Sequence, residues 1–204
     1  MRLYRIRYST NVERVALALA HKRLAVESIW VEAADRSEVV RVSGQELVPV
    51  LEVGDTVVCD SLAILSWLEQ HWPEPPLYPP DRARRAELEL FLDWFDRVWK
   101  RPPNELEAEL QRPRLDQARI AALTGQLARA LDRFEQLLDG RDYLFGDGFS
   151  AADCAAFPFL KYAAMRESDD DELFHRILHQ RQPLGDSHPR LEAWIRRVDE
   201  RPRV

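Results

Sequence analysis

Residues 48–61 read VPVLEVGDTVVCDS, and this stretch decides the fold of the first part of the chain. Apolar, largely β-branched residues fill 50–53 and 56–59 around Gly54-Asp55, which predicts a hairpin of two short strands. Pro49 stands at the entrance of the first strand, where the missing N–H donor is tolerated. After the second strand, Asp60-Ser61 opens an amphipathic pattern over 61–72 that predicts a helix.

The 47 residues before this hairpin alternate between strand and helix patterns. Period-two apolar spacing predicts strands over 2–7 and 26–32, and helical spacing predicts helices over 12–24 and 35–42. The order β-α-β-α-β-β-α is typical of a mixed sheet with helices packed on its faces. We therefore expect an α/β domain over residues 1–74.

Five prolines then fall between positions 73 and 80, and such a composition cannot continue a helix. We expect a proline-rich linker over 75–81. Beyond it no strand pattern is evident, and helical periodicity predicts an all-α helical-bundle domain over 82–204. The expected helices cover 82–101, 115–138, 150–165, 169–179 and 187–200.

Charge and composition exclude several classes of function. The formal net charge of −6 has the wrong sign for a protein that grips nucleic acid. No apolar run approaches the length that crosses a bilayer, so we expect a soluble, cytoplasmic protein without a membrane partner. The two cysteines, Cys59 and Cys154, form no CxxC pair, which favours a reducing compartment and no structural zinc.

The first candidate site is the segment Tyr8 to Asn11, just before a predicted helix. Thr10 and Glu13 fit a capping box, which needs no ligand. Ser9 would then precede the cap and could direct its hydroxyl over the positive helix end, where an anion is stabilised. A bound thiol would be stabilised there in its anionic, thiolate form. A free thiol has a pKa of about 8.5, and lowering this pKa by about two units requires roughly 2.7 kcal/mol of interaction with the site.

Two further segments could bind a peptide-like ligand. Val48 could pair through its backbone with an extended ligand by strand addition, although Pro49 could equally be a simple strand-initiating proline, cis or trans. Asp60 or Ser61 could be an ordinary N-cap. Alternatively, the Ser61 hydroxyl and the free N–H groups could hold a carboxylate while Asp60 faces an ammonium, which together are an amino-acid head group.

These signals, in this order before a linker and a helical half, resemble the glutathione S-transferase family over the whole chain. Residues 9–15, Ser-Thr-Asn-Val-Glu-Arg-Val, are similar to the serine-type motif of the zeta class, with Asn11 where zeta members carry cysteine. They are also similar to the Thr-Pro-Asn pattern of the bacterial nu class. The resemblance implies a thioredoxin-like N-terminal domain, a cytosolic homodimer, and Ser9, Thr10 or Asn11 at the glutathione sulfur.

The same resemblance implies that Pro49 is cis, that Val48 pairs with the cysteinyl part of glutathione, and that Asp60-Ser61 binds the γ-glutamyl group. Residues 43–49 look like the family's Asn-Pro-x-Gly-Lys-Val-Pro segment, with Leu47 in place of the usual cation or amide. Gln45 is then the candidate for the glycyl carboxylate. In the helical half, residues 150–153 are similar to the family's Ser-x-x-Asp folding motif, and we expect Phe149 to pack on Cys154 beside that capping box.

The first helix of the second half carries a stripe of apolar residues that is core or dimer seam. The family resemblance makes Trp94, Arg97 and Arg101 candidate lining residues of a pocket for an electrophile. Glu172, His175 and His179 would share a helix face, and a His pair at this spacing can bind zinc. Since the sequence contains no motif typical of a metal site, we expect no bound metal.

Together these observations predict a glutathione transferase in which the thiolate of bound glutathione attacks a hydrophobic electrophile. A glutathione-dependent isomerase, or a disulfide reductase or peroxidase of the same fold, is an alternative. A non-catalytic binding or assembly module is a third, because a shared fold does not guarantee chemistry.

Overall fold

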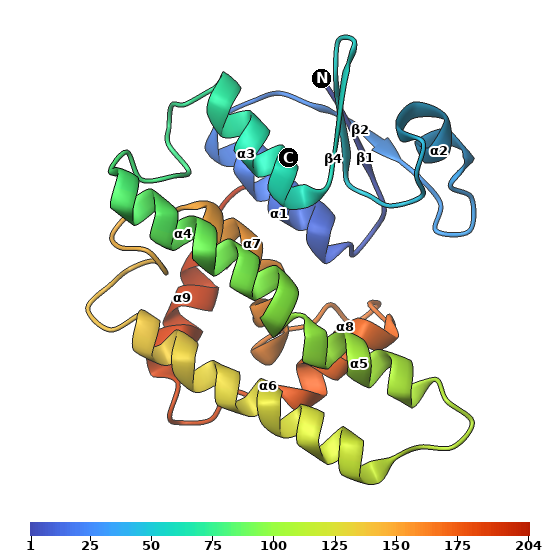
Figure 1. Ribbon diagram of the computed structural model, residues 1–204, viewed down its shortest axis with the longest axis vertical. Coiled ribbons are helices and arrows are strands. Elements are labelled where there is room, and N and C mark those ends of the chain that lie inside the picture. Colours follow the sequence, from blue (N-terminus) through green and yellow to red (C-terminus); the bar gives the residue numbers. More distant parts are fainter. The chain divides into compact units, whose positions relative to one another are not determined.

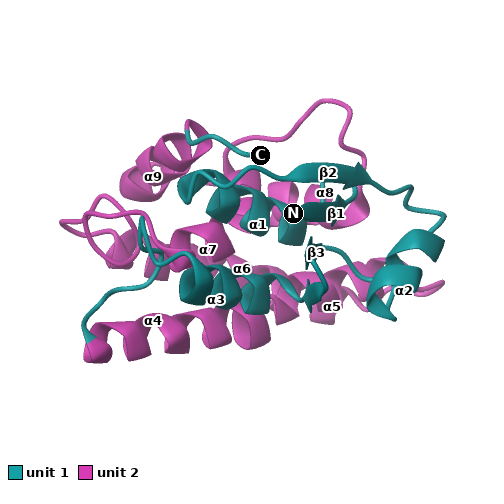
Figure 2. Ribbon diagram, turned by 90° about the horizontal axis from the view of Figure 1, so that it is seen from above, with its two compact units in different colours: residues 1–81, 201–204 teal, residues 82–200 magenta.

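The computed structural model describes all 204 residues, and its contacts divide the chain into two compact units. Unit 1 comprises Met1–Asp81 together with the tail Arg201–Val204, and unit 2 comprises Arg82–Glu200 (Figure 2). No helix is both long enough and apolar enough to cross a membrane.

Unit 1 is built on a four-stranded mixed sheet in the order β2-β1-β3-β4. Its strands are β1 (Arg2–Arg5), β2 (Glu27–Trp30), β3 (Val50–Val53) and β4 (Thr56–Cys59). β1 runs parallel to β2 and antiparallel to β3, which in turn pairs antiparallel with β4. The helices are α1 (Thr10–His21), α2 (Ser37–Ser43) and α3 (Ser61–His71), with α1 and α3 packed side by side (Figure 1). The predicted thioredoxin-like order of elements is confirmed.

The core of unit 1 forms where the apolar face of the sheet meets the helices. Tyr4, Val39 and Val50, from β1, α2 and β3, are fully buried in one cluster, and Cys59 is packed against it. The Tyr4 hydroxyl leaves this cluster to donate to Glu52, 2.8 Å away. Burial raises the pKa of Tyr4 above its ordinary value, and the hydrogen bond to Glu52 adds to the shift.

The proline-rich segment is fastened to unit 1 by a buried ion pair. Lys22 Nζ lies 2.7 Å from Glu69 Oε2 and also donates to the carbonyl oxygens of Trp72 and Pro75 at 2.6 and 3.1 Å. Glu69 in turn accepts from the backbone N–H of Leu77 at 3.0 Å. The two side chains thus bind backbone groups of residues 72–77, so the ion pair holds the end of α3 and the proline-rich segment in place.

The last four residues fold back onto unit 1. Arg203 donates to the Glu13 carboxylate at 3.1 and 3.2 Å, and Arg5 donates to the carbonyl oxygen of Val204 at 2.6 Å. Arg201 lies 2.9 Å from His21 Nδ1. These contacts tie the tail to β1 and to both ends of α1.

Unit 2 is helical throughout, with α4 (Arg82–Trp94), the π-helical turn η1 (Phe95–Trp99), α5 (Arg101–Leu110), α6 (Gln117–Leu137), α7 (Ala151–Leu160), the short η2 (Lys161–Ala163), α8 (Leu173–Arg181) and α9 (Pro189–Asp199). The sequence pattern predicts one helix over 82–101 and no separate helix after it, so α5 was not predicted. Pro102 and Pro103 obscured it, yet both stand in the first turn, where the N–H groups have no helical partner.

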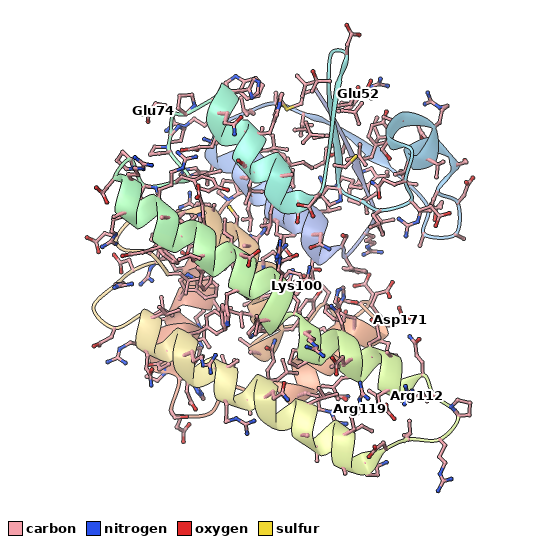
Figure 3. The ribbon with its side chains drawn as sticks, in the orientation of Figure 1. Glu52, Glu74, Lys100, Arg112, Arg119 and Asp171 are labelled. Atoms are coloured by element: carbon pink, nitrogen blue, oxygen red, sulfur yellow. The ribbon has the colours of Figure 1, made fainter.

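Aromatic side chains fill the core of unit 2. Phe95 stacks on Trp99 with ring centroids 4.5 Å apart, and Phe134 and Phe159 meet both rings edge-on. Arg112 follows the end of α5, and Arg119 lies in the first turn of α6, so both are at the end of this helix pair where the two helices are joined (Figure 3). Both lie within ion-pair distance of the buried Glu109 carboxylate, at 3.1 and 3.7 Å.

The capping box of α7 has the predicted residues. Asp153 is fully buried, and its Oδ2 accepts from the backbone N–H and the hydroxyl of Ser150 at 2.9 and 2.8 Å. Its Oδ1 accepts from the Leu144 N–H at 3.0 Å and from Trp194 Nε1 at 2.8 Å. The Phe149 ring meets the Tyr143 ring edge-on, with ring centroids 5.8 Å apart.

Candidate functional site

Three segments of unit 1 leave the sheet at the same edge. Tyr4 faces Val50 across the β1–β3 ladder, and Val50 faces Cys59 across the β3–β4 ladder. Because both ladders are antiparallel, the segment after β1, the one before β3 and the one after β4 meet at this edge. These segments are 6–10, 48–49 and 60–61, so the fold brings together the three stretches that the sequence analysis selected.

At the start of α1, Ser9 and not Thr10 is the N-cap. Ser9 has an extended backbone, and its Oγ accepts from the Val12 N–H at 3.3 Å, while Thr10 is the buried first residue of the helix. The expected capping box on Thr10 is therefore wrong: the cap is Ser9, and the residue three places on, Val12, has no side-chain acceptor to complete a box. Tyr8 has a φ of 61°, and this left-handed turn sets the helix entry one residue earlier than propensity indicates. The Ser9 hydroxyl accepts one hydrogen bond, and its own O–H can still donate to a ligand.

Asn11 follows in the first turn of α1 and is half-buried. Its side-chain Oδ1 is buried and accepts no hydrogen bond. A buried amide oxygen without a partner is costly unless a ligand or the fold satisfies it. The Asn11 amide is therefore a second group at this helix end that the fold has not fully used.

The Val48–Pro49 peptide bond is cis, as the family resemblance implies. Pro49 is buried and Val48 is half-buried, directly before β3. Neither the N–H nor the C=O of Val48 is paired with another backbone group. The edge at Val48 thus offers a donor and an acceptor to an extended ligand.

Asp60 is the N-cap of α3. Its Oδ1 accepts from the N–H groups of Leu62 and Ala63 at 2.9 and 3.0 Å, and its φ of 71° is unusual for a residue with a side chain. The neighbouring Ser61 is buried, and its Oγ accepts from Arg14 Nη1 at 3.1 Å. The second carboxylate oxygen of Asp60 and the Ser61 O–H are the groups that can meet an ammonium and a carboxylate.

Arg14 is a site residue that the sequence reasoning missed. It lies on α1 with only 1% of its surface exposed, inside the run Val-Glu-Arg-Val-Ala-Leu. A charged side chain on the buried face of a helix is rare unless it is held by partners. That position, three residues from Asn11 and Leu17, was the available signal, because it falls on the apolar stripe of the helix.

Gln45 is already engaged within its own loop. Its Oε1 accepts from the Leu47 N–H and its Nε2 donates to the Leu47 carbonyl, both at 2.8 Å. This pair of hydrogen bonds presents the Leu47 side chain outward, and 75% of that residue is exposed.

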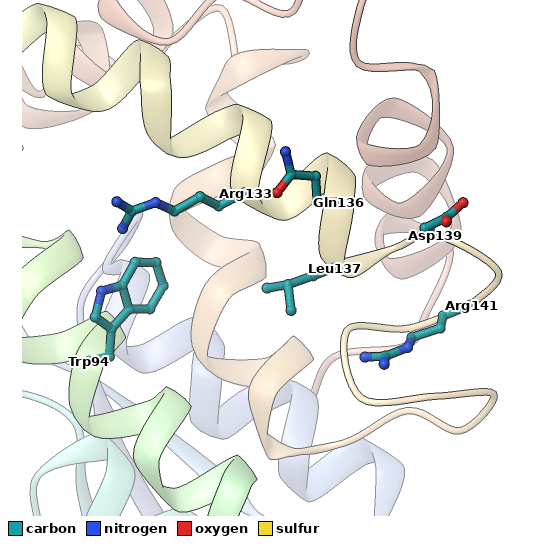
Figure 4. Close-up of a pocket in the computed structure, with 6 residues that line it drawn as sticks. All are labelled: Trp94, Arg133, Gln136, Leu137, Asp139 and Arg141. Carbon is teal, nitrogen blue, oxygen red and sulfur yellow. The ribbon is translucent and has the colours of Figure 1, made fainter.

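The three residues selected in unit 2 differ in their surroundings. Trp94 of α4 lines a cavity of about 410 Å³, with Arg133 of α6 facing it (Figure 4). Arg97 and Arg101 are exposed and form ion pairs with Asp93 and Glu105, at 2.7 and 2.6 Å. Neither arginine lines this cavity. The full lining is Trp94, Arg133, Gln136, Leu137, Asp139 and Arg141.

The histidines of α8 are engaged in hydrogen bonds. His175 Nδ1 lies 2.8 Å from the buried Asp170 carboxylate, and its ring stacks on Tyr162 at 4.5 Å. His179 Nδ1 lies 2.9 Å from the Tyr162 carbonyl oxygen. No group of three or more His, Cys, Asp or Glu side chains has an arrangement that could hold a metal ion.

Comparison with known proteins agrees with this architecture. The family described as glutathione S-transferase, N-terminal domain, matches residues 3–76, and the corresponding C-terminal domain matches residues 117–197. A crystal structure of a glutathione S-transferase from Rhodospirillum rubrum F11 is 31% identical, with a TM-score of 0.75 over 98% of this chain and 88% of that one.

Curated relatives have diverse names. FtsZ-localized protein A of Caulobacter vibrioides is 34% identical over 155 residues, or 70% of this chain and 68% of that protein. Maleylpyruvate isomerase of Ralstonia sp is 29% identical over 83% of this chain and 85% of that protein. Pyrimidodiazepine synthase of Drosophila melanogaster is 32% identical over 103 residues, and the chain spans less than half of its length. The family's N-terminal and C-terminal domains match the two halves of the chain, so the chain belongs to the glutathione S-transferase family.

Proposed function

We propose that this protein is a glutathione transferase that activates the thiol of bound glutathione for attack on a small hydrophobic electrophile. The observation that carries the proposal is the convergence of the Ser9 N-cap, the open backbone at Val48 and the Asp60-Ser61 cap at one edge of the sheet. The Ser9 hydroxyl can donate to the sulfur of a γ-glutamyl thiol, the Val48 backbone can pair with its cysteinyl part, and Asp60-Ser61 can bind its amino-acid head group. The family membership supports the same ligand.

In the proposed complex, the cysteinyl backbone of glutathione pairs with the N–H and C=O of Val48, and its sulfur lies at the N-terminus of α1. Ser9 donates its O–H to the thiolate. The Asn11 side chain adds a second hydrogen bond to the sulfur through its amide nitrogen, or it holds the Ser9 hydroxyl in position. The helix dipole favours the same charge. The sulfur is the nucleophile: the thiol proton has already left to solvent, and a lone pair of the thiolate forms the bond to the electrophilic carbon. The bond from that carbon to the leaving group breaks in the same reaction, and the leaving group departs to solvent with its electron pair.

The test is the pKa of the bound thiol in Ser9→Ala, Asn11→Ala and a control, Ser66→Ala, in the middle of α3. Thiolate absorbance during a pH titration reports this pKa, and steady-state kinetics report turnover. We expect Ser9→Ala to raise the bound-thiol pKa by one to about two units and to lower turnover about tenfold or more, with glutathione affinity little changed. If the thiol pKa of Ser9→Ala equals that of the control, Ser9 does not stabilise the thiolate, and Asn11 and Thr10 become the candidates.

We further propose a cytoplasmic homodimer with a role in detoxification. Leu90 of α4 and Val98 of η1 are apolar and 71% and 54% exposed, and they are the candidates for contact with a second copy of the chain. Sedimentation velocity at micromolar concentration measures the oligomeric state. A monomer at all concentrations would contradict the dimer.

Two other functions have specific support. The similarity to maleylpyruvate isomerase favours a glutathione-dependent isomerase, in which glutathione is regenerated and not consumed. The similarity to FtsZ-localized protein A favours a non-catalytic assembly module. Calorimetry with reduced glutathione separates the enzymes from the module, and following free thiol during turnover separates conjugation from isomerisation. A disulfide reductase or peroxidase would instead oxidise glutathione, which the same thiol assay detects.

A further inference from the structure

The tail Arg201–Val204 brings a positive charge to the start of α1. Arg203 Nε and Nη2 donate to Glu13 Oε1 at 3.2 and 3.1 Å, and Arg203 Nη1 donates to the Arg201 carbonyl oxygen at 2.8 Å. The side chains of Arg203 and Glu13 are only 25% and 17% exposed, so salt screens their charges less than it screens an open surface pair. The two residues are 190 positions apart, and no periodicity in the sequence indicates this ion pair.

Glu13 stands one helical turn after Ser9. Its backbone N–H donates to the Ser9 carbonyl oxygen at 3.0 Å, and residues four apart along a helix lie on the same side of it. A carboxylate in the first turn is favourable to the helix itself, but it repels a second negative charge at the same helix end. A thiolate at Ser9 is such a charge, and the argument from here rests on the proposed binding of a thiol at Ser9.

Arg5, the last residue of β1, is a second cation near this carboxylate. It donates to the carbonyl oxygen of Val204 at 2.6 Å, and its guanidinium lies 4.6 Å from the centroid of the Trp30 ring. Burial lowers the pKa of Arg5, and the charge of Glu13 opposes that shift. Glu13 therefore acts electrostatically on Arg5 as well as on Arg203, so its charge is felt across this end of unit 1.

Several other charged side chains belong to the segments that meet here. They are Arg7 between β1 and α1, Arg14 of α1, Glu32 after β2, Glu46 before the cis-proline, Asp60 of α3 and Arg201 of the tail. Arg14 donates to Ser61, and Asp60 accepts from N–H groups of α3. Arg203 lies outside the three segments of the candidate site, so its charge can be removed without changing a residue that contacts the ligand.

We propose that Arg203 offsets the charge of Glu13 at the start of α1 and thereby makes the Ser9 end of the site favourable to a thiolate. Arg203 is a positioning residue that acts through Glu13 and not by contact with the ligand. The tail is thus a part of the thiol site that comes from the opposite end of the sequence. Its contribution is the charge of Arg203, and not the anchoring of the tail.

The two members of the ion pair should therefore have opposite effects on the pKa of bound glutathione, measured from thiolate absorbance. Arg203→Gln removes the cation and should raise this pKa by about half a unit, as expected for one charge at about 10 Å in a partly solvated site. Glu13→Gln removes the anion and should lower the thiol pKa by a similar amount. Loss of an anchoring contact would instead move the thiol pKa in the same direction in both variants, and that result, or no shift in either, overturns the proposal.

A charge-conserving variant and a matched ion pair complete the set. Arg203→Lys keeps the charge without the guanidinium fork and should retain the wild-type thiol pKa, whereas a rise equal to that of Arg203→Gln would assign the effect to anchoring. Arg85→Gln and Glu89→Gln break an ion pair of the same length, 3.1 Å, on α4, and should leave the thiol pKa unchanged. Far-UV circular dichroism checks that each variant folds.

A thiol introduced by Ser9→Cys tests the same electrostatic effect without glutathione. The pH dependence of its alkylation by iodoacetamide gives its pKa, and mass spectrometry separates position 9 from Cys59 and Cys154. We expect Arg203→Gln to raise this pKa and Glu13→Gln to lower it. Opposite shifts here, without glutathione binding to the wild-type chain, would refute the proposed function and leave the role of Arg203 standing. Shifts in the same direction, or none, overturn that role whether or not glutathione binds.

Discussion

The buried carboxylate of Asp153 gives the sharpest stability prediction. It accepts four hydrogen bonds, two at each oxygen, from Leu144, Trp194 and Ser150. Burial raises the pKa of Asp153 above its ordinary value, and the donated hydrogen bonds oppose that shift. The carboxylate links the start of α7 to α9 and to the loop that precedes α7, so its removal leaves several donors buried without partners.

Asp153→Ala orphans three N–H donors that cannot reorient, at about 1–3 kcal/mol each, so the expected loss is about 3–9 kcal/mol. That range reaches the whole stability of many folded domains, about 5–15 kcal/mol. Asp153→Asn keeps Oδ1 for Leu144 and Trp194, and the Ser150 hydroxyl can rotate to accept from the new amide. Only the Ser150 N–H then lacks an acceptor, so we expect a loss of about 1–3 kcal/mol.

Urea unfolding followed by far-UV circular dichroism measures both losses without relying on Trp194 fluorescence. Asp147→Asn, in the exposed loop before Ser150, is the matched control, and we expect it to change the free energy of unfolding by about 0.5 kcal/mol or less. Equal midpoints for Asp153→Asn and Asp147→Asn would refute the reasoning, as would a cost for Asp153→Ala no larger than that for Asp153→Asn.

Two further predictions concern unit 1. Burial, chiefly, holds the pKa of His21 below its ordinary value of about 6.5, and the neighbouring Arg201 cation adds to the shift. The unfolded chain therefore binds a proton that the folded chain does not, so the free energy of unfolding should fall as pH drops from about 6.5 toward the lowered pKa. His21→Gln should flatten this part of the pH dependence in urea titrations, and a wild-type curve that is already flat there would contradict the assignment. Lys22→Met leaves the buried Glu69 carboxylate unpaired and should cost about 3–5 kcal/mol. Adding Glu69→Gln should recover part of that loss, and a double variant less stable than Lys22→Met alone would argue against the ion pair as the cause.

Most elements of unit 1 were predictable because local patterns and tertiary packing agree there. The strands Val50–Val53 and Thr56–Cys59 have the predicted bounds, since Gly54-Asp55 suits a tight turn between β-branched runs. The α1 cap was misplaced because the left-handed Tyr8 that brings the helix entry forward has no sequence signature. The α5 helix was missed because propensity treats two prolines as breakers without regard to their place in the first turn.

The sequence by itself determined which segments carry the chemistry, because strand, turn and cap signals act over a few residues. It pointed to Ser9 to Asn11, to Val48-Pro49 and to Asp60-Ser61. Only the tertiary structure decided which hydrogen bonds each side chain makes and which of its polar groups stay open to a ligand. The register of two antiparallel ladders gathers the three segments at one edge. Long-range hydrogen bonds place Arg14 behind Ser61, while a short-range one turns the Gln45 amide back on its own loop. Such commitments depend on side-chain direction and burial, which periodicity along one chain does not contain.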